Sequence, residues 1–249
     1  MLGRFFGRLT GGNWRPPVDE LAFASAVGFD TVQIRSQRPG ELEDELGVGA
    51  AELGAMFDDA GLEPVLEMLV RHEGEPGTFS RALRANLRAI DEIGFLRVHI
   101  HPVGPALAPQ TLATELVDAV AVAEESELIF GIEHNAPGHR ILVEPDEVEA
   151  LLDAVPALGL VWDINHTRTD DLPRFLAFQE RFTLVHVSDT PLPETNHHLP
   201  LGRGNVDFAP VRDLDVPLIL EIGGLPQSGG PGLDTDEALR DSLARLLAA

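Results

Sequence analysis

Six polar side chains able to bind metal or transfer protons each close an apolar, β-rich run of the sequence. They are Glu67, His101, Glu133, Asp163, His186 and Glu221. Successive members are 34, 32, 30, 23 and 35 residues apart, close to the length of one strand-plus-helix unit. Carboxylates and imidazoles bind divalent cations and move protons. We therefore expect these side chains to meet at one site.

The acids of this set stand among apolar neighbours, where an unpaired charge is costly to bury. This holds for Glu133, Asp163 and Glu221, each of which follows branched or aromatic residues. Three carboxylates brought together repel one another unless a cation lies between them, and a purely structural charge network is the alternative. Carboxylates with one imidazole suit Mn²⁺ or Mg²⁺ and accept Co²⁺ or Zn²⁺. We expect one divalent cation, Mn²⁺ first, and no organic cofactor.

The elements that position these residues alternate between two hydrophobic periods. Strands are expected at Thr31–Ile34, Pro64–Val70, Arg97–His101, Leu128–Glu133, Leu158–Asp163, Thr183–Val187 and Pro217–Ile222, with a first one around Arg4–Leu9. Helices are expected at Val18–Val27, Val48–Ala60, Phe79–Ile93, Pro109–Glu125, Pro145–Val155, Asp171–Arg181 and Thr235–Ala248, with at best a short one at Phe208–Asp213.

Strands that alternate with helices predict a parallel α/β architecture, because a parallel crossover needs a helix-sized connection. The 249 residues divide into eight units of about 31 residues, which matches a (β/α)8 TIM barrel. An open doubly wound sheet normally has a G-x-G-x-x-G turn after its first strand, and Gly11–Trp14 does not fit it. We therefore predict a single TIM-barrel domain over residues 1–249, with the site at the carboxyl ends of the strands.

Composition excludes several kinds of chemistry. The chain has no cysteine, and all 18 basic residues are arginine, which rules out thiol nucleophiles, Schiff-base lysines and the Walker phosphate loop. A net charge of −23 argues against nucleic acid as a partner. No apolar run approaches the roughly 20 residues that span a bilayer. We expect a cytoplasmic protein that acts on a small molecule, without a membrane partner, and self-association is left open.

The chain resembles the xylose isomerase-like TIM barrels over the whole barrel, specifically from Glu133 onward and only generically before it. The runs that carry the resemblance are Val161–His166, Val185–Asp189, His198–Phe208 and Leu220–Ile222. That superfamily contains sugar isomerases and 3-epimerases, hydroxypyruvate isomerase, inosose dehydratase and the endonuclease IV type of apurinic nuclease. The resemblance implies a set of four metal ligands, namely Glu133, Asp163, His186 and Glu221. It also implies that His166 holds substrate or a second ion.

In the isomerase branch, the resemblance implies that Glu133 and Glu221 also exchange a proton with the substrate from opposite faces, through an enediolate bound to the ion. We therefore predict a metal-dependent isomerase or epimerase for a small sugar, sugar phosphate or hydroxy-carbonyl compound. The alternatives are an inosose dehydratase-like enzyme, an endonuclease IV-like metallo-phosphodiesterase, and a sugar-binding barrel without turnover.

The nuclease branch uses three zinc ions, and the match to its additional ligands is partial. His101 and His198 fit that pattern, whereas Asn196 stands where an aspartate is expected and Glu67 where an early-strand histidine is expected. An amide is a poor substitute for a ligating carboxylate. These residues are therefore candidates for a second metal or for substrate binding.

Other residues carry weaker signals. Arg203 lies in the loop nearest the predicted metal and is our first candidate for contact with a substrate anion, while Arg35 and Arg71 follow strands and could clamp a carboxylate or phosphate. Trp14 and Trp162 could form walls of a sugar site, although packing is the simpler role for both.

Overall fold

The computed structural model describes residues 1–6, 15–36, 38–223 and 225–248. Its strands close into a parallel barrel in sequence order, with β1 paired to β2 on one side and to β8 on the other. They are β1 (Leu2–Phe6), β2 (Thr31–Ser36), β3 (Glu63–Arg71), β4 (Arg97–Val103), β5 (Ile129–Glu133), β6 (Gly159–Asp163), β7 (Phe182–Val187) and β8 (Leu218–Leu220). The predicted (β/α)8 TIM barrel is confirmed.

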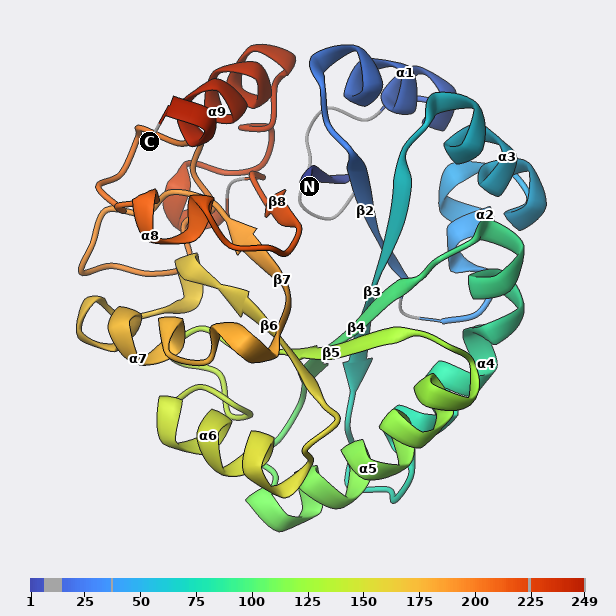
Figure 1. The fold of residues 1–249 in the computed structure, drawn as a ribbon, viewed down its shortest axis with the longest axis vertical. Coiled ribbons are helices and arrows are strands. Elements are labelled where there is room, and N and C mark those ends of the chain that lie inside the picture. Colours follow the sequence, from blue (N-terminus) through green and yellow to red (C-terminus); the bar gives the residue numbers. More distant parts are fainter. Residues whose placement is uncertain (7–14, 37, 224, 249) are drawn as a thin grey trace.

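The helices form a ring outside the strands (Figure 1). They are α1 (Pro17–Val27), α2 (Glu41–Leu46), α3 (Ala50–Ala60), α4 (Thr78–Ile93), α5 (Pro109–Glu125), α6 (Pro145–Ala154), α7 (Leu172–Leu176), α8 (Ala209–Arg212) and α9 (Asp236–Ala248). None of those in the described part of the chain is long and apolar enough to cross a bilayer.

Two helical segments differ from expectation. Helix α2 was not predicted, because it has six mostly acidic residues between Gly40 and Gly47, whose φ angles of +79° and +73° end the helix on both sides. The predicted continuous helix Asp171–Arg181 is wrong. It is broken into α7 and two 3₁₀ turns, and Phe175 is the residue of α7 that is buried, so a longer helix would add little apolar burial.

The first predicted strand begins earlier than expected, at Leu2. The part of that prediction beyond Phe6 lies outside the described residues, as does Trp14. The last predicted strand, Pro217–Ile222, is shorter in the structure, but the Glu221 N–H still donates to Val187 O at 3.1 Å and so continues the pairing with β7.

An apolar layer fills the barrel and a polar layer covers it. The apolar layer consists of Phe5, Val65, Val161, Leu184 and Ile219. Because side chains two residues apart on a strand face the same side, four of these positions are followed inside the barrel by candidate site residues. Those residues are Glu67, Asp163, His186 and Glu221. The alternation of the strands therefore places the site at their carboxyl ends.

A buried ionic cluster joins the first and last units of the barrel. Arg4, fully buried on β1, lies 2.6 Å from Glu20 Oε1 of α1 and 3.6 Å from Asp234, which precedes α9. Arg15 lies 2.8 Å from Glu20 Oε2 and also contacts Asp236 at the start of α9. This cluster connects α1 to α9 across the β1–β8 seam.

Candidate metal centre

The four predicted ligands converge at the carboxyl end of the barrel. Glu133 ends β5, Asp163 ends β6, His186 lies on β7 and Glu221 follows β8. One donor atom from each lies within 4.8 Å of the others, and all four side chains are buried. The structure therefore brings together residues that are up to 88 positions apart in the sequence.

The donor atoms of this set have unmet hydrogen-bonding capacity that fits a cation. His186 Nδ1 lies 3.4 Å from Glu133 Oε1 and 3.1 Å from Glu221 Oε2. These three atoms, together with Glu133 Oε2 and Asp163 Oδ2, are buried and form no hydrogen bond with a described residue. Buried acceptors that face one another need a cation or a proton between them. The oxygen-rich donor set suits a hard divalent ion.

The other nitrogen of the His186 ring is fixed by a residue that the sequence analysis did not single out. Gln33, fully buried on β2, accepts a hydrogen bond from His186 Nε2 at 2.9 Å through its Oε1. Its Nε2 donates to Glu67 Oε2 at 3.2 Å. The available signal was a polar residue within an apolar strand, two positions before Arg35 and on the same face.

Glu67 and His101 form a second carboxylate–imidazole group beside the first. Arg35 donates to Glu67 Oε1 from Nε at 2.8 Å, and its Nη2 lies 2.6 Å from the same oxygen. Burial opposes ionisation of the Glu67 carboxyl, but the Arg35 charge prevails and lowers its pKa. The structure therefore pairs Glu67 with a fixed guanidinium.

His101 lies between two of the acids. Its Nδ1 is 3.3 Å from Glu67 Oε1 and 3.2 Å from Glu133 Oε2, and its Nε2 donates to Asn135 Oδ1 at 2.9 Å. The Asn135 amide is oriented by two backbone carbonyls that accept from its Nδ2 at 2.9 Å. Burial disfavours the charged ring, but Glu133 and Glu67 outweigh it and raise the pKa of His101 to about 10.

His166 turns one ring nitrogen toward the centre, whereas both His198 nitrogens are engaged, Nδ1 with the Glu221 carbonyl and Nε2 with Asn196 Oδ1 at 2.9 Å. Backbone carbonyls only accept hydrogen bonds, so His166 Nδ1, 3.1 Å from the His134 carbonyl, and His198 Nδ1, 3.0 Å from the Glu221 carbonyl, carry hydrogen. This leaves His166 Nε2 3.1 Å from Asp163 Oδ2. Burial lowers the pKa of His166 to about 3 and raises that of Asp163 to about 7.

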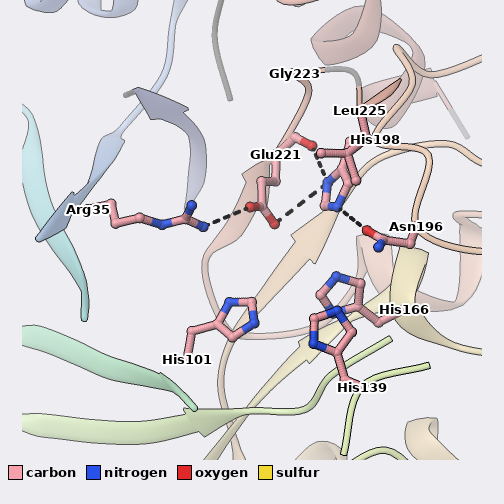
Figure 2. Close-up of a pocket in the computed structure, with 9 residues that line it drawn as sticks. All are labelled: Arg35, His101, His139, His166, Asn196, His198, Glu221, Gly223 and Leu225. Carbon is pink, nitrogen blue, oxygen red and sulfur yellow. Dashed lines mark hydrogen bonds and ion pairs between the residues drawn. The ribbon is translucent and has the colours of Figure 1, made fainter. Parts of the chain in front are cut away.

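A cavity of about 220 Å³ opens above these groups (Figure 2). Its lining residues are Arg35, His101, His139, His166, Asn196, His198, Glu221, Gly223 and Leu225. Figure 2 shows the Arg35 guanidinium and the His198 ring on either side of the Glu221 carboxylate. Of the described residues that line the cavity, Arg35 is the one with a permanent positive charge.

Three of the weaker candidates lie elsewhere. Arg203 is exposed and does not line the cavity, because the loop that carries it turns outward, and Arg71 is exposed at the end of β3. Trp162 points away from the site, packs on Phe182 with ring centroids 5.4 Å apart, and donates from Nε1 to Thr167 Oγ1 at 2.9 Å. Its role is packing. His139 lines the cavity and was not predicted.

The comparison with known families agrees with the fold. A family model described as the xylose isomerase-like TIM barrel matches residues 21–223. The chain belongs to this family. The resemblance inferred from the sequence is therefore confirmed. Among curated proteins, none matches this sequence.

Solved structures share the family fold over nearly the whole chain. D-allulose 3-epimerase from Methylomonas sp. is 17% identical with a TM-score of 0.77, covering 99% of this chain and 96% of its own. The IOLI protein with a bound zinc atom is 15% identical with a TM-score of 0.77, covering 99% and 98%. 3-keto-D-glucoside 4-epimerase from E. coli is 15% identical with a TM-score of 0.73, covering 100% and 99%. At these identities the likeness establishes the shared fold.

Proposed function

We propose that this protein is a divalent-metal-dependent isomerase or epimerase that acts on a small sugar or a related hydroxy-carbonyl compound. The observation that carries the proposal is the pair of buried glutamates, Glu133 and Glu221, on either side of His186 Nδ1, with oxygens that receive no hydrogen bond from a described residue. The family and the zinc atom bound in one structural relative support the same assignment.

In this proposal Glu133, Asp163, His186 and Glu221 hold the ion, with Mn²⁺ as our first expectation. A divalent ion supplies Lewis-acid polarisation of a substrate carbonyl. Glu221 is the base at the cavity. Although burial opposes ionisation, His186 and His198 lower the pKa of Glu221, so it is in the ionised form that a general base requires.

The Glu221 oxygen assigned to proton transfer is Oε1, because Oε2 faces His186 Nδ1. Oε1 lies 3.7 Å from Arg35 Nη2, which would also contact a substrate oxygen in the cavity. On the opposite face of the reacting carbon, Glu133 would deliver a proton drawn from the His101 imidazolium, whose Nδ1 lies 3.2 Å from Glu133 Oε2. Glu221 would then release its proton to solvent. The pKa of Glu133 is likewise lowered, because His101 and His186 outweigh the effect of burial.

The proposal is tested by metal content and by exchange of a carbon-bound hydrogen. Protein purified without added metal is analysed for ions per chain, and small ketoses and hydroxy-carbonyl compounds are incubated with it in D₂O. We expect one divalent ion per chain and deuterium incorporation without loss of water. Loss of water from the substrate would instead support a dehydratase, and a chain that binds no divalent ion would overturn the metal-dependent reaction.

The phosphodiesterase alternative has less support. Glu67 is paired with Arg35 rather than left to a metal, and the net charge of −23 disfavours binding to phosphates. We expect duplex DNA with an abasic site to be neither cleaved nor bound in a salt-dependent manner. Nicking of that duplex would make the phosphodiesterase the leading proposal.

A further inference from the structure

Gln33 crosses the barrel interior between two groups that differ in hydrogen-bonding capacity. It lies on β2, with Glu67 on the adjacent β3 and His186 on β7. An ionised carboxylate only accepts hydrogen bonds, so the amide –NH₂ must face Glu67 Oε2, at 3.2 Å. The amide oxygen therefore faces His186 Nε2, at 2.9 Å. Glu67 thus fixes which way the amide of Gln33 points.

The direction of the amide decides the state of the His186 ring. An amide oxygen is only an acceptor, so the His186 nitrogen opposite it must carry hydrogen. In the neutral ring the lone pair then lies on Nδ1, the nitrogen that faces Glu133 and Glu221 at 3.4 and 3.1 Å. A neutral imidazole with a free lone pair is the form that binds a metal.

We propose that Gln33 is a positioning residue for the metal centre, because its side-chain carbonyl holds the His186 ring with Nε2–H bound and Nδ1 presented to the ion. This inference rests on the proposed metal-dependent function and goes beyond it by assigning a residue outside the four ligands. Partners that orient a ligating histidine contribute about 10- to 100-fold to metal affinity.

The amide is itself held in place by the cavity wall. Arg35 occupies Glu67 Oε1 through Nε and Nη2, which leaves Oε2 for Gln33. The chain of contacts therefore runs from Arg35, which lines the cavity, through Glu67 and Gln33 to His186. Glu67 is bonded to Arg35, Gln33 to Glu67, and His186 to Gln33, so each contact restricts the orientation of the next side chain.

Three variants test the proposal. Gln33→Met has a similar length but makes neither hydrogen bond. Gln33→Glu keeps an acceptor for His186 Nε2–H, and its carboxyl group shares one proton with Glu67 because two buried carboxylates this close cannot both ionise. Gln179→Met is the matched control, because Gln179 is exposed near β7 and away from the cavity. Each is stripped of metal, its Tm is measured to establish folding, and Zn²⁺ binding is measured by titration calorimetry.

The second readout is the ring itself. Long-range ¹H–¹⁵N spectra of histidine-labelled, Zn²⁺-loaded protein report which nitrogen of His186 carries hydrogen and which binds metal. We expect wild type and Gln179→Met to show Nε2–H with zinc on Nδ1. Gln33→Met should bind Zn²⁺ about 10- to 100-fold more weakly and lose the protected Nε2–H signal. Gln33→Glu should bind more nearly as wild type does.

The outcomes separate this inference from the proposed function. Wild-type affinity and ring signals in Gln33→Met would overturn the role of Gln33 alone. So would a Gln33→Glu variant that keeps Nε2–H on His186 and still binds Zn²⁺ as weakly as Gln33→Met. A wild-type protein without a divalent-ion site would overturn the proposed function together with this inference.

Discussion

Two imidazoles of the site are held alike and face different surroundings. His186 and His101 each donate Nε2–H to a side-chain amide oxygen, that of Gln33 or Asn135, at 2.9 Å. Each also turns Nδ1 toward two glutamates, and Glu133 is shared by both pairs. The local geometry of the rings therefore does not distinguish a metal ligand from another role.

The two groups differ in their contact with the guanidinium of Arg35. In the His101 pair, Arg35 is bonded to Glu67 and supplies positive charge permanently. In the His186 pair, the nearest described guanidinium is again Arg35, 3.7 Å from Glu221 Oε1. Burial opposes the charged form of both rings, but their neighbouring glutamates outweigh it and raise the pKa of both His101 and His186. The two pairs differ in that a guanidinium already neutralises one carboxylate of the His101 pair. The predictions below test this contrast.

The largest effect is expected for Glu221→Gln, which removes the proposed base and one ion ligand together. Turnover should fall by more than the about 10²- to 10⁴-fold typical of a lost general base, while Tm shows that the protein stays folded. The measurement is kcat on any substrate found for the wild type. Near-normal activity of the variant would contradict the mechanism.

Metal content of single histidine variants should show which histidine binds the ion. His186→Ala should lose more affinity than the about 10- to 100-fold contributed by outer partners, because a ligand is removed. His101→Ala and His198→Ala should each retain one ion per chain, as measured by elemental analysis. Loss of an ion from both of these variants, from a wild type holding more than one, would place them in a multinuclear cluster instead.

Replacing Arg35 should make the Glu67–His101 pair behave more like the proposed ion site around His186. In Arg35→Met, Glu67 is buried without its cation, which should cost about 3–5 kcal/mol of stability in ion-free protein. Added Mn²⁺ should recover part of this by binding near Glu67 and His101, so that the stoichiometry rises from one ion to two. Arg35→Lys keeps the charge and serves as the control. An Arg35→Met protein with wild-type stability and one ion per chain would show that Arg35 does not keep a second ion from the Glu67–His101 pair.

The smallest effect is a pH dependence of ion-free protein. The pKa of His101, raised to about 10 in the folded state, exceeds the ordinary value of 6.5. The stability that this imidazolium contributes is therefore complete below about pH 6.5 and is lost as the pH rises toward 10. Tm should decline between pH 7 and 10, and less so in His101→Gln. Equal declines in the two proteins would assign the effect to other groups.

The sequence was sufficient to predict the barrel and to group the ion-binding candidates. Charged residues at the ends of apolar runs give a strong signal because burial of a lone charge is costly, and their spacing repeats once per strand-plus-helix unit. Gln33 and Asn135 were not predicted, because burying a neutral amide does not carry the cost of burying a lone charge. Arg203 was our first candidate for contact with a substrate, yet Arg35 is the arginine that lines the cavity, because strand register and loop conformation decide which side chain reaches it.

Some predictions about the whole molecule are not tested by the structure. The single domain over residues 1–249, the cytoplasmic location, Mn²⁺ as the resident ion and any self-association stay predictions. The resident ion, the location and self-association depend on ion availability, cellular context and protein concentration.

The distribution of the ligands over β5, β6, β7 and the end of β8 has a consequence for how the protein folds. No early fragment of the chain contains the ion site, and the ring of His186 is oriented by Gln33 from β2. In the proposed function the ion binds after β5 to β8 have come together, so it should slow unfolding while leaving the folding rate almost unchanged. At an ion concentration 100 times Kd, this kinetic protection corresponds to about 2.7 kcal/mol.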